Sequence, residues 1–366
     1  MTLTDLILTK IKSHPPMSFA EFMQWALYAP QGGYYTVGLK QFGQDFTTAP
    51  EISCLFSYAV AQQCIDVLTH LTHPVILEFG AGSGRMCIDL LTYLEQEHCL
   101  PETYYILELS GELQSQQHHA FTESIPHLLP RIQWLQTWPE ASFEGVILAN
   151  EVLDAMPVHR FLQTEDHLYE ICVDVKDDHL HEVLRICDNE VLQKHVSHAL
   201  PSNLYPYQSE VNLFVEDWIK QCSSLLHKGL MLILDYGFPR HEYFHPDRHQ
   251  GTLMCHHLHR AHTNPLIHIG EQDITAHVEF THVAEAAFAA GFAVSGFTSQ
   301  ASFLLANGLL SLLEACSPKQ LFKQQQAVKT LLQPNEMGEL FKVMALTKAW
   351  DEPLRGFQIQ DRRASL

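Results

Sequence analysis

The sequence predicts an α/β fold, a doubly wound Rossmann-like sheet of seven strands with an N-terminal helical region and an inserted subdomain. Two observations predict it. From residue 74 onward, short apolar runs such as Val75–Phe79 alternate with helical segments, as in a parallel sheet covered on both faces. The chain has 366 residues, 46% of them hydrophobic, which is enough for a deep core and too apolar for a mainly disordered protein.

The N-terminal part is predicted to be helical. Ser18 and Glu21 have the spacing of a capping box, so a helix is expected to begin there, and the Pro15-Pro16 pair separates it from a shorter helix. Three helices are predicted in this part: a short one that begins at Thr4, a second over residues 18–28 and a third over residues 53–71.

Seven later segments are predicted strands, because each is a short apolar run bounded by turn residues. They are residues 75–79, 104–108, 132–135, 143–149, 230–234, 292–297 and 341–347, and the last two are expected to pair as a hairpin. The predicted helices between and after them cover 86–97, 111–123, 211–227 and 278–290, with two more over 302–332. In such a sheet, the loops at the carboxyl ends of the strands form the site.

Two segments interrupt this alternation. Residues 160–186 alternate polar and apolar side chains, which predicts a hairpin inserted on the sheet. Residues 238–272 are rich in histidine and predict a long, irregular loop.

Composition excludes several classes of protein. Lys and Arg total 22 against 42 Asp and Glu, and the resulting charge of −20 argues against a nucleic-acid or anionic-membrane partner. The nine cysteines form no CxxC pair and indicate a reduced chain. No signal, transit or membrane-spanning segment is recognised, so we expect a cytoplasmic protein of bacterial type without membrane insertion. The sequence indicates no oligomeric state.

A glycine-rich turn follows the first of the seven strands. Gly80, Gly82 and Gly84 allow left-handed backbone and close approach of a ligand. Arg85 stands where a dinucleotide fingerprint would continue toward its third glycine, and Glu78 would face a pyrophosphate unfavourably. A ligand with positive charge, such as the sulfonium of S-adenosyl-L-methionine, suits this acid better. A structural turn with solvated carboxylates is the alternative.

Glu108 ends the second strand, where a carboxylate can accept both ribose hydroxyls of a nucleoside. Together with Asn150 and Glu151 after the fourth strand, these motifs make the chain resemble class I S-adenosylmethionine-dependent methyltransferases. More closely, it resembles the MidA family, which includes the mitochondrial complex I assembly methyltransferase. The resemblance spans nearly the whole chain through seven segments in the family's order: 19–23, 32–35, 45–53, 77–84, 150–158, 235–237 and 251–278.

The resemblance implies methyl transfer from S-adenosyl-L-methionine to a protein arginine, with a respiratory complex I subunit as the type of target. The expected cofactor-binding residues are Glu78, Gly80, Gly82, Gly84, Glu108, Asn150, Thr48, Pro50 and Glu51. The expected substrate-binding residues are Asp45, Asp235, Tyr236 and His277. The expected regions are an N-terminal helical region over the cofactor site (1–72), a methyltransferase core (73–159 and 226–348), an inserted cap with a hairpin (160–225) and a His-rich substrate loop within the core (238–277).

Glu151 and Asp154 are the expected catalytic residues. An arginine guanidinium has a pKa above about 12, so two carboxylates on its outer N–H groups would orient it and draw charge from the attacking nitrogen. Their spacing of three would place both on one face of a first helical turn. A carboxylate that only stabilises a helix start is the alternative for Asp154, as a turn or cap role is for Asp45 and Glu51, and a structural tyrosine for Tyr236.

Other functions remain open at this point. A small-molecule N- or O-methyltransferase would share the same core, and an assembly factor could bind the cofactor without catalysis. A nicotinamide oxidoreductase is disfavoured by Glu78 and Arg85. Cys255 and the histidines near it match no common zinc spacing, so no metal site is expected.

Overall fold

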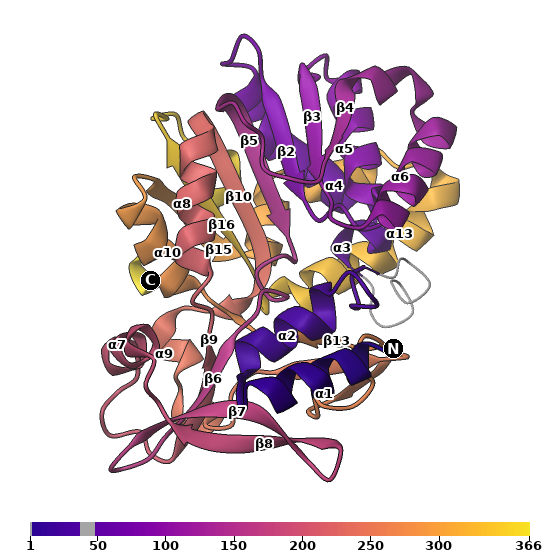
Figure 1. Cartoon of the computed structure of the whole chain (residues 1–366). Coiled ribbons are helices and arrows are strands. Elements are labelled where there is room, and N and C mark those ends of the chain that lie inside the picture. The colour runs from indigo at the N-terminus through magenta and orange to yellow at the C-terminus, as the bar shows by residue number, and fades with distance from the viewer. Residues whose placement is uncertain (1, 37–47) are drawn as a thin grey trace. The chain divides into compact units, whose positions relative to one another are not determined.

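The computed structural model of the chain describes residues 2–36 and 48–366 (Figure 1). These residues form two compact units. The main-sheet unit comprises the described parts of Thr47–Val152, Asp217–Gly237 and Phe280–Leu366, and the hairpin unit those of Met1–Phe46, Leu153–Glu216 and Phe238–Glu279. These bounds differ from the expected regions, because residues 48–72 and 217–225 group with the main sheet and residues 153–159 and 238–279 with the hairpins.

The main sheet has seven strands in the order β15-β16-β10-β5-β2-β3-β4. Neighbours from β10 to β4 run parallel, whereas β16 runs antiparallel to both β10 and β15. This confirms the predicted doubly wound α/β sheet with a final hairpin pair. The strands are β2 (Val75–Phe79), β3 (Thr103–Leu107), β4 (Ile132–Leu135), β5 (Phe143–Asn150), β10 (Leu226–Phe238), β15 (Ala293–Ser299) and β16 (Phe341–Lys348).

Apolar side chains cover both faces of this sheet. Ile76 of β2 and Val146 of β5 belong to the buried cluster that includes Phe56 of α4 (Cys54–Leu68). Because side chains alternate along a strand, Phe79 points to the opposite face, where its ring contacts Trp218 of α8 (Val215–Leu225) at 5.3 Å between centroids. Burial of a large aromatic side chain contributes roughly 1.5–3 kcal/mol to folding, so both helical layers stabilise the sheet that carries the glycine-rich turn.

The helices of this unit mostly fall where the sequence predicts them. The predicted helix 53–71 begins at Cys54, where the Ser53 side chain accepts from the Leu55 N–H, and the segment 302–332 holds three helices because Gly308 (φ 76°) separates two of them. The helices are α3 (Ala49–Ile52), α4 (Cys54–Leu68), α5 (Arg85–Gln96), α6 (Gly111–Ser124), α8 (Val215–Leu225), α10 (Phe280–Ala289), α11 (Gln300–Ala306), α12 (Leu309–Glu314) and α13 (Pro318–Leu332).

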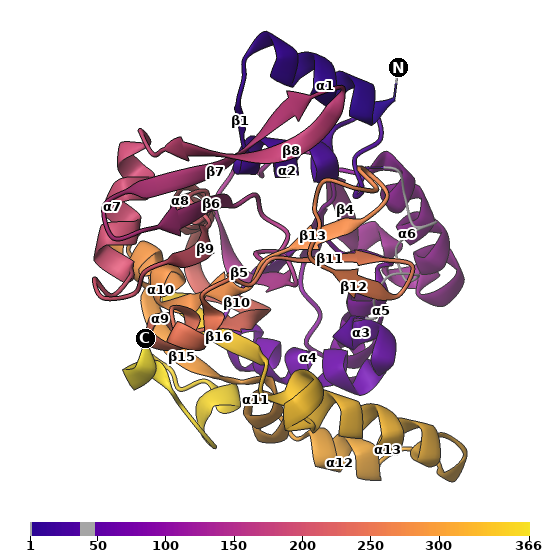
Figure 2. The same cartoon turned by 90° about the horizontal axis from the view of Figure 1, so that it is seen from below.

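The hairpin unit contains a five-stranded antiparallel sheet in the order β1-β7-β6-β9, with β8 paired to β7 (Figure 2). The predicted hairpin over 160–186 is confirmed by β6, β7 and β8, and Ser18 caps the next helix as expected. The strands of this sheet are β1 (Met17–Ser18), β6 (His159–Gln163), β7 (Leu168–Lys176), β8 (His179–Ile186) and β9 (Tyr207–Val211), whereas the short strand β14 (Val278–Glu279) pairs with β10. The helices are α1 (Leu3–Ser13), α2 (Phe19–Tyr28), α7 (Glu190–Ala199) and α9 (Arg240–Tyr243).

The prediction of a wholly irregular histidine-rich loop is wrong. Residues 238–272 contain β11 (Met254–His257) and β12 (Arg260–His262), which form a second antiparallel sheet with the following strand β13 (Asp273–Thr275) in the order β12-β11-β13. Cys255 and Ile274 face each other across β11 and β13, and both are fully buried. This buried pair stabilises the sheet, whereas the surrounding histidines hide the alternation in the sequence.

All nine cysteines are free, and six of them are buried. Within the described ranges, no helix combines the length and the apolar character needed to cross a membrane.

Candidate functional site

The glycine-rich turn lies at the carboxyl end of β2 and leads into α5. Gly80, Gly82 and Gly84 have φ values of 60°, 54° and 80°, which other residues adopt only with strain. A Cβ atom at Gly84 would lie 2.4 Å from Cε1 of Phe121. The turn therefore requires glycine, as the spacing in the sequence predicts, and it presents backbone at the start of a helix.

The short helix α3 contacts this turn through Glu51. The Ser83 hydroxyl donates to Oε1 of Glu51 and accepts from the N–H of Arg85 at 3.2 Å. Pro50 is buried, and Thr48 precedes the helix as its N-cap residue. The structure thus brings Glu51 to the glycine-rich turn, and Thr48 and Pro50 are at the start of the same short helix.

Glu78 is the penultimate residue of β2 and is only 2% exposed. Its Oε2 accepts a hydrogen bond of 2.8 Å from the hydroxyl of Tyr104 on β3. Desolvation by burial raises the pKa of Glu78 to about 7; the Tyr104 hydrogen bond opposes that shift and the charge of Glu108 adds to it. A buried acid with only a neutral donor favours a ligand that brings positive charge.

Glu108 directly follows β3 and is also buried. Its Oε1 accepts from the N–H of Ser110 at 3.0 Å, and its Oε2 accepts from Nε2 of Gln117 at 3.3 Å. Desolvation by burial raises the pKa of Glu108, and these neutral donors offset part of that rise. The carboxylate is held at the strand end, where the sequence predicts contact with a nucleoside.

Gln117 of α6 is a site residue that sequence reasoning missed. Its Nε2 also donates to the carbonyl oxygen of Gly82 at 2.8 Å, and its Oε1 accepts from Nε1 of Trp134 at 2.8 Å. Gln117 therefore connects the glycine-rich turn with Glu108. The buried face of α6 consists of Leu113, Gln117 and Phe121, and a glutamine within this i, i+4, i+8 stripe is the signal that could have found it.

The ends of β5 and β10 form the second half of this edge. The N–H of Glu151 donates to the carbonyl of Leu234 at 2.9 Å, and Nδ2 of Asn150 donates to Oε1 of Glu151 at 3.3 Å. Asp235 is fully buried, and its Oδ2 accepts from the N–H of Val152 at 3.2 Å. The parallel pairing of β5 with β10 thus brings Asn150, Glu151 and Asp235 together.

Tyr236 follows Asp235 on β10. Its N–H donates to Oδ1 of Asp235 at 2.9 Å, and its ring contacts Phe341 edge-on at 5.4 Å between centroids. The side chain thus packs against β16, as the structural alternative for this residue expects.

The predicted helical turn after β5 is wrong. Residues 151–158 form no helix, and Glu151 has a left-handed φ of 53°. Such backbone costs on the order of 1–3 kcal/mol in a residue other than glycine and concentrates at functional sites. Glu151 therefore does not share a helix face with Asp154, whose role must be considered separately.

Asp154 and His277 lie in the hairpin unit. The carbonyl of Asp154 accepts from the N–H of Ala276 at 2.9 Å, so the two expected residues are neighbours there. The His277 ring stacks on Phe238 at 5.4 Å between centroids, and the backbone N–H of His277 donates to Oγ1 of Thr252 at 3.1 Å. Asp45 lies outside the described residues. Among those that are described, no three His, Cys, Asp or Glu side chains are placed to hold a metal ion.

Comparison with known proteins assigns the chain to a family. A family model described as "Putative S-adenosyl-L-methionine-dependent methyltransferase" matches residues 59–298. The chain belongs to this methyltransferase family. A crystal structure of a "likely methyl transferase" from Burkholderia thailandensis, bound to S-adenosyl-homocysteine, is 36% identical to this chain. The match covers 100% of this chain and 96% of that chain, with a TM-score of 0.94. The predicted family and cofactor, S-adenosyl-L-methionine, are confirmed.

Two curated relatives of the methyltransferase carry more specific names. The Drosophila melanogaster "Protein arginine methyltransferase NDUFAF7 homolog, mitochondrial" is 28% identical over 94% of this chain and 84% of its own length. The Homo sapiens "Protein arginine methyltransferase NDUFAF7, mitochondrial" is 27% identical over 93% of this chain and 82% of its own length.

Proposed function

We propose that this methyltransferase methylates an arginine of a protein substrate, with a respiratory complex I subunit as the type of target. The observation that carries the proposal is Glu151, a carboxylate held in left-handed backbone beside Asn150 at the end of β5. The names of the relatives with 27–28% identity support arginine as the acceptor. The net charge of −20 favours a basic substrate.

The residues at the carboxyl ends of β2 and β3 fit the cofactor. The glycines carry no side chain that would cover the backbone of the turn, Glu108 offers a carboxylate to ribose hydroxyls, and Glu78 offers one to a positive group. The proposed cofactor-binding residues are Glu78, Gly80, Gly82, Gly84, Glu108, Asn150, Thr48, Pro50 and Glu51. When bound, S-adenosyl-L-methionine supplies an electrophilic methyl group on its sulfonium.

The chain's own contribution to the reaction is to orient the acceptor and exclude water. Glu151 accepts an outer N–H of the guanidinium, which draws positive charge away from the attacking nitrogen. Asp154 is proposed as the second such carboxylate, and Asp45, Asp235, Tyr236 and His277 as substrate-binding residues. A charge-assisted hydrogen bond to each outer nitrogen fixes the plane of the guanidinium.

The deciding experiment incubates the purified protein with methyl-labelled S-adenosyl-L-methionine and a cell lysate. We expect label on one polypeptide, located at an arginine by mass spectrometry. Label only in the small-molecule fraction would establish the alternative of a small-molecule methyltransferase. Cofactor binding without any transfer would establish a non-catalytic assembly factor.

Gly82→Val tests the site itself. A β-branched side chain is severely strained at a φ of 54°, so binding of S-adenosyl-homocysteine should fall below detection by calorimetry while the thermal transition persists. Gly291→Val, at a position where a Cβ meets no atom within 4 Å, is the control for a positive-φ glycine outside the turn. Normal affinity in Gly82→Val would refute the assignment of the turn.

A further inference from the structure

Strand β8 forms one edge of the five-stranded sheet in the hairpin unit (Figure 1, Figure 2). It pairs with β7 along its whole length, from Lys176↔His179 to Tyr169↔Ile186. Strands β1 and β6 occupy the other edge of β7. Within the described part of the chain, no strand pairs with the outer edge of β8.

The hairpin geometry determines which backbone groups of β8 face outward. Asp177 and Asp178 form a two-residue turn with φ values of 50° and 61°, as a type I′ turn requires. The closing pair of such a hairpin exchanges both hydrogen bonds, and the pattern then alternates along the strand. The N–H and C=O groups directed away from β7 therefore belong to Leu180, Glu182, Leu184 and Ile186, and none of them bonds to another described backbone group.

This edge also carries exposed apolar side chains at alternate positions. Leu184 is 55% exposed and Ile186 is 62% exposed, and their even spacing places both on one face of β8. Val191, at the start of α7, is 60% exposed. Natural proteins usually protect a free edge by covering or shortening it, whereas this one has eight residues and an apolar strip beside it.

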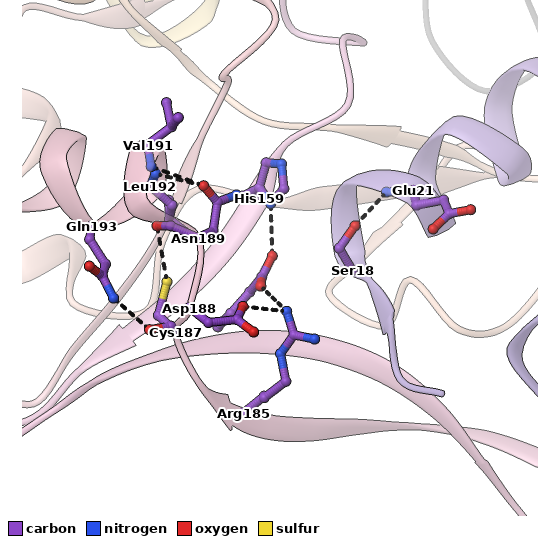
Figure 3. A network of polar contacts seen from close by, with 11 residues as sticks. Ser18, Glu21, His159, Arg185, Cys187, Asp188, Asn189, Val191, Leu192 and Gln193 are labelled. Carbon is purple, nitrogen blue, oxygen red and sulfur yellow. Dashed lines mark hydrogen bonds and ion pairs between the residues drawn. The ribbon is translucent and has the colours of Figure 1, made fainter. Parts of the chain in front are cut away.

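The opposite face of β8 is held by a network of polar contacts (Figure 3). Arg185 donates to Oε2 of Glu170 on β7 at 3.1 Å and to Oδ1 of Asp188 at 3.0 Å, while His159 of β6 bonds Glu170 at 2.8 Å. Arg185 thus holds the C-terminal half of β8 against β7, and Glu170 in turn joins β7 to β6. A rigid edge lowers the ordering cost when a second strand is added.

The charges around the edge indicate the partner's character. Residues 176–190 contain five acidic side chains against one lysine and one arginine. Lys12 pairs with Asp178 and Arg160 with Glu182, which leaves a small acidic excess at the edge of a chain whose total charge is −20. A second copy of the chain would bring two acidic edges together. An extended segment with basic residues would be attracted to the edge.

We propose that the outer edge of β8 docks an extended, basic segment of the protein substrate by strand addition. The segment's backbone pairs with Leu180, Glu182, Leu184 and Ile186, and its apolar residues at alternate positions cover Leu184 and Ile186. This proposal deepens the proposed function and rests on it, since it concerns how a protein substrate is held.

The test uses a fluorescein-labelled nonapeptide of alternating lysine and valine, which contains no arginine and therefore cannot be the proposed methyl acceptor. We expect it to bind the full-length protein and to slow hydrogen exchange of the β8 amides. Methylating the backbone nitrogens along one edge of the peptide, or replacing its lysines with glutamate, should each weaken binding more than tenfold. Equal binding by the backbone-methylated peptide, or unchanged exchange in β8, would overturn the proposal.

Two variants complete the experiment. Leu184→Lys adds a charge to the edge and should weaken peptide binding more than tenfold. Leu310→Lys alters a similarly exposed leucine of α12, at 51%, and should bind as the wild type does. Equal losses in both variants would contradict a specific site, and a wild-type dimer that dissociates in Leu184→Lys would show that the edge pairs with a second copy instead.

Calorimetry with S-adenosyl-homocysteine and the lysate labelling described above are run on the same variants. A protein that labels an arginine but ignores the peptide retains the proposed function and loses only the docking site. A protein that binds the peptide at β8 but transfers no methyl group to protein loses the proposed function.

Discussion

Glu78 in the main-sheet unit and Glu170 in the hairpin unit are buried to almost the same degree, at 2% and 1% exposure, yet their pKa values shift in opposite directions. Around Glu78, desolvation dominates and only a neutral tyrosine donates, so the pKa rises to about 7. Around Glu170, desolvation also raises the pKa, but the hydrogen bond and charge of His159 together with Arg185 outweigh it, and the pKa falls.

This difference separates a structural carboxylate from one available to a ligand. Glu170 is compensated within the chain, so its charge joins β6, β7 and β8. Glu78 and Glu108 accept hydrogen bonds only from neutral donors within the described residues, so burial leaves their charge uncompensated and raises both pKa values. In the proposed function, the cofactor supplies the positive charge or hydroxyl groups that complete their environment.

Glu151→Gln should cause the largest loss of methyl transfer among substitutions of the carboxylates that follow the strands. Methyl transfer should fall by about 100-fold or more, because the amide no longer draws charge from the guanidinium, whereas the affinity for S-adenosyl-homocysteine should hardly change. Label incorporation into protein measures the first and calorimetry the second. Glu144→Gln, near the other end of β5, is the matched control. Turnover close to the wild-type rate would remove Glu151 from the mechanism.

Exchanging the two buried glutamates for glutamine should separate their effects on stability. Glu170→Gln should lower the free energy of unfolding at pH 7 by about 2 kcal/mol, because it removes the charged acceptor that His159 and Arg185 share while Arg185 keeps its bond to Asp188. Since folding lowers the pKa of Glu170, its contribution is present above the unfolded-state value near 4.3 and is lost as the pH falls through the folded-state value. Chemical denaturation at pH 7 and pH 4 measures both.

The controls for that prediction are Asp188→Asn and Glu78→Gln. Asp188 is 74% exposed and should change stability by less than about 0.5 kcal/mol. Glu78→Gln should not destabilise at pH 7, because a raised pKa means that stability falls as the pH rises from about 4.5 to about 7. A large loss in Glu78→Gln would show that both glutamates are structural.

The parts of the site that sequence predicted are those with a local cause. Gly80, Gly82 and Gly84 mark a left-handed turn between a strand and a helix, and Glu108 was identified because it follows a strand. The same holds for the sheet, whose strands are short apolar runs. Each of these features depends on residues close together in the chain.

The parts that sequence missed depend on residues distant in the chain or on backbone geometry. Gln117 acts through contacts with Gly82 and Trp134, 35 and 17 residues away. The left-handed backbone of Glu151 could not be predicted, because glutamate is not a residue type that indicates a positive φ. Because of this backbone conformation, Glu151 and Asp154 do not share one face of a helix as predicted.

The pH dependence of cofactor affinity tests whether the charge of Glu78 is available to a ligand. If an ionised Glu78 favours the sulfonium, the affinity for S-adenosyl-L-methionine should rise about tenfold between pH 6 and pH 8, as a group with a pKa of about 7 loses its proton. S-adenosyl-homocysteine lacks the sulfonium charge and should show a smaller rise. Glu78→Gln should flatten both profiles, and a persistent tenfold rise in this variant would assign the dependence to another group.

Gln117→Leu should produce the smallest effect. The substitution removes one neutral hydrogen-bond donor to Glu108 and to the glycine-rich turn, but it leaves Glu108 and the glycines in place. We expect about a fivefold loss of affinity for S-adenosyl-homocysteine at pH 8, equivalent to about 1 kcal/mol. The Gln117 hydrogen bond offsets part of the rise in the pKa of Glu108, so its loss raises that pKa further and the deficit should widen at pH 6. Gln116→Leu, on the exposed side of α6, should match the wild type. An affinity loss that is the same at pH 8 and pH 6 would mean that Gln117 acts only on the conformation of the turn. An affinity loss that is larger at pH 6 would show that this neutral donor helps to keep Glu108 ionised.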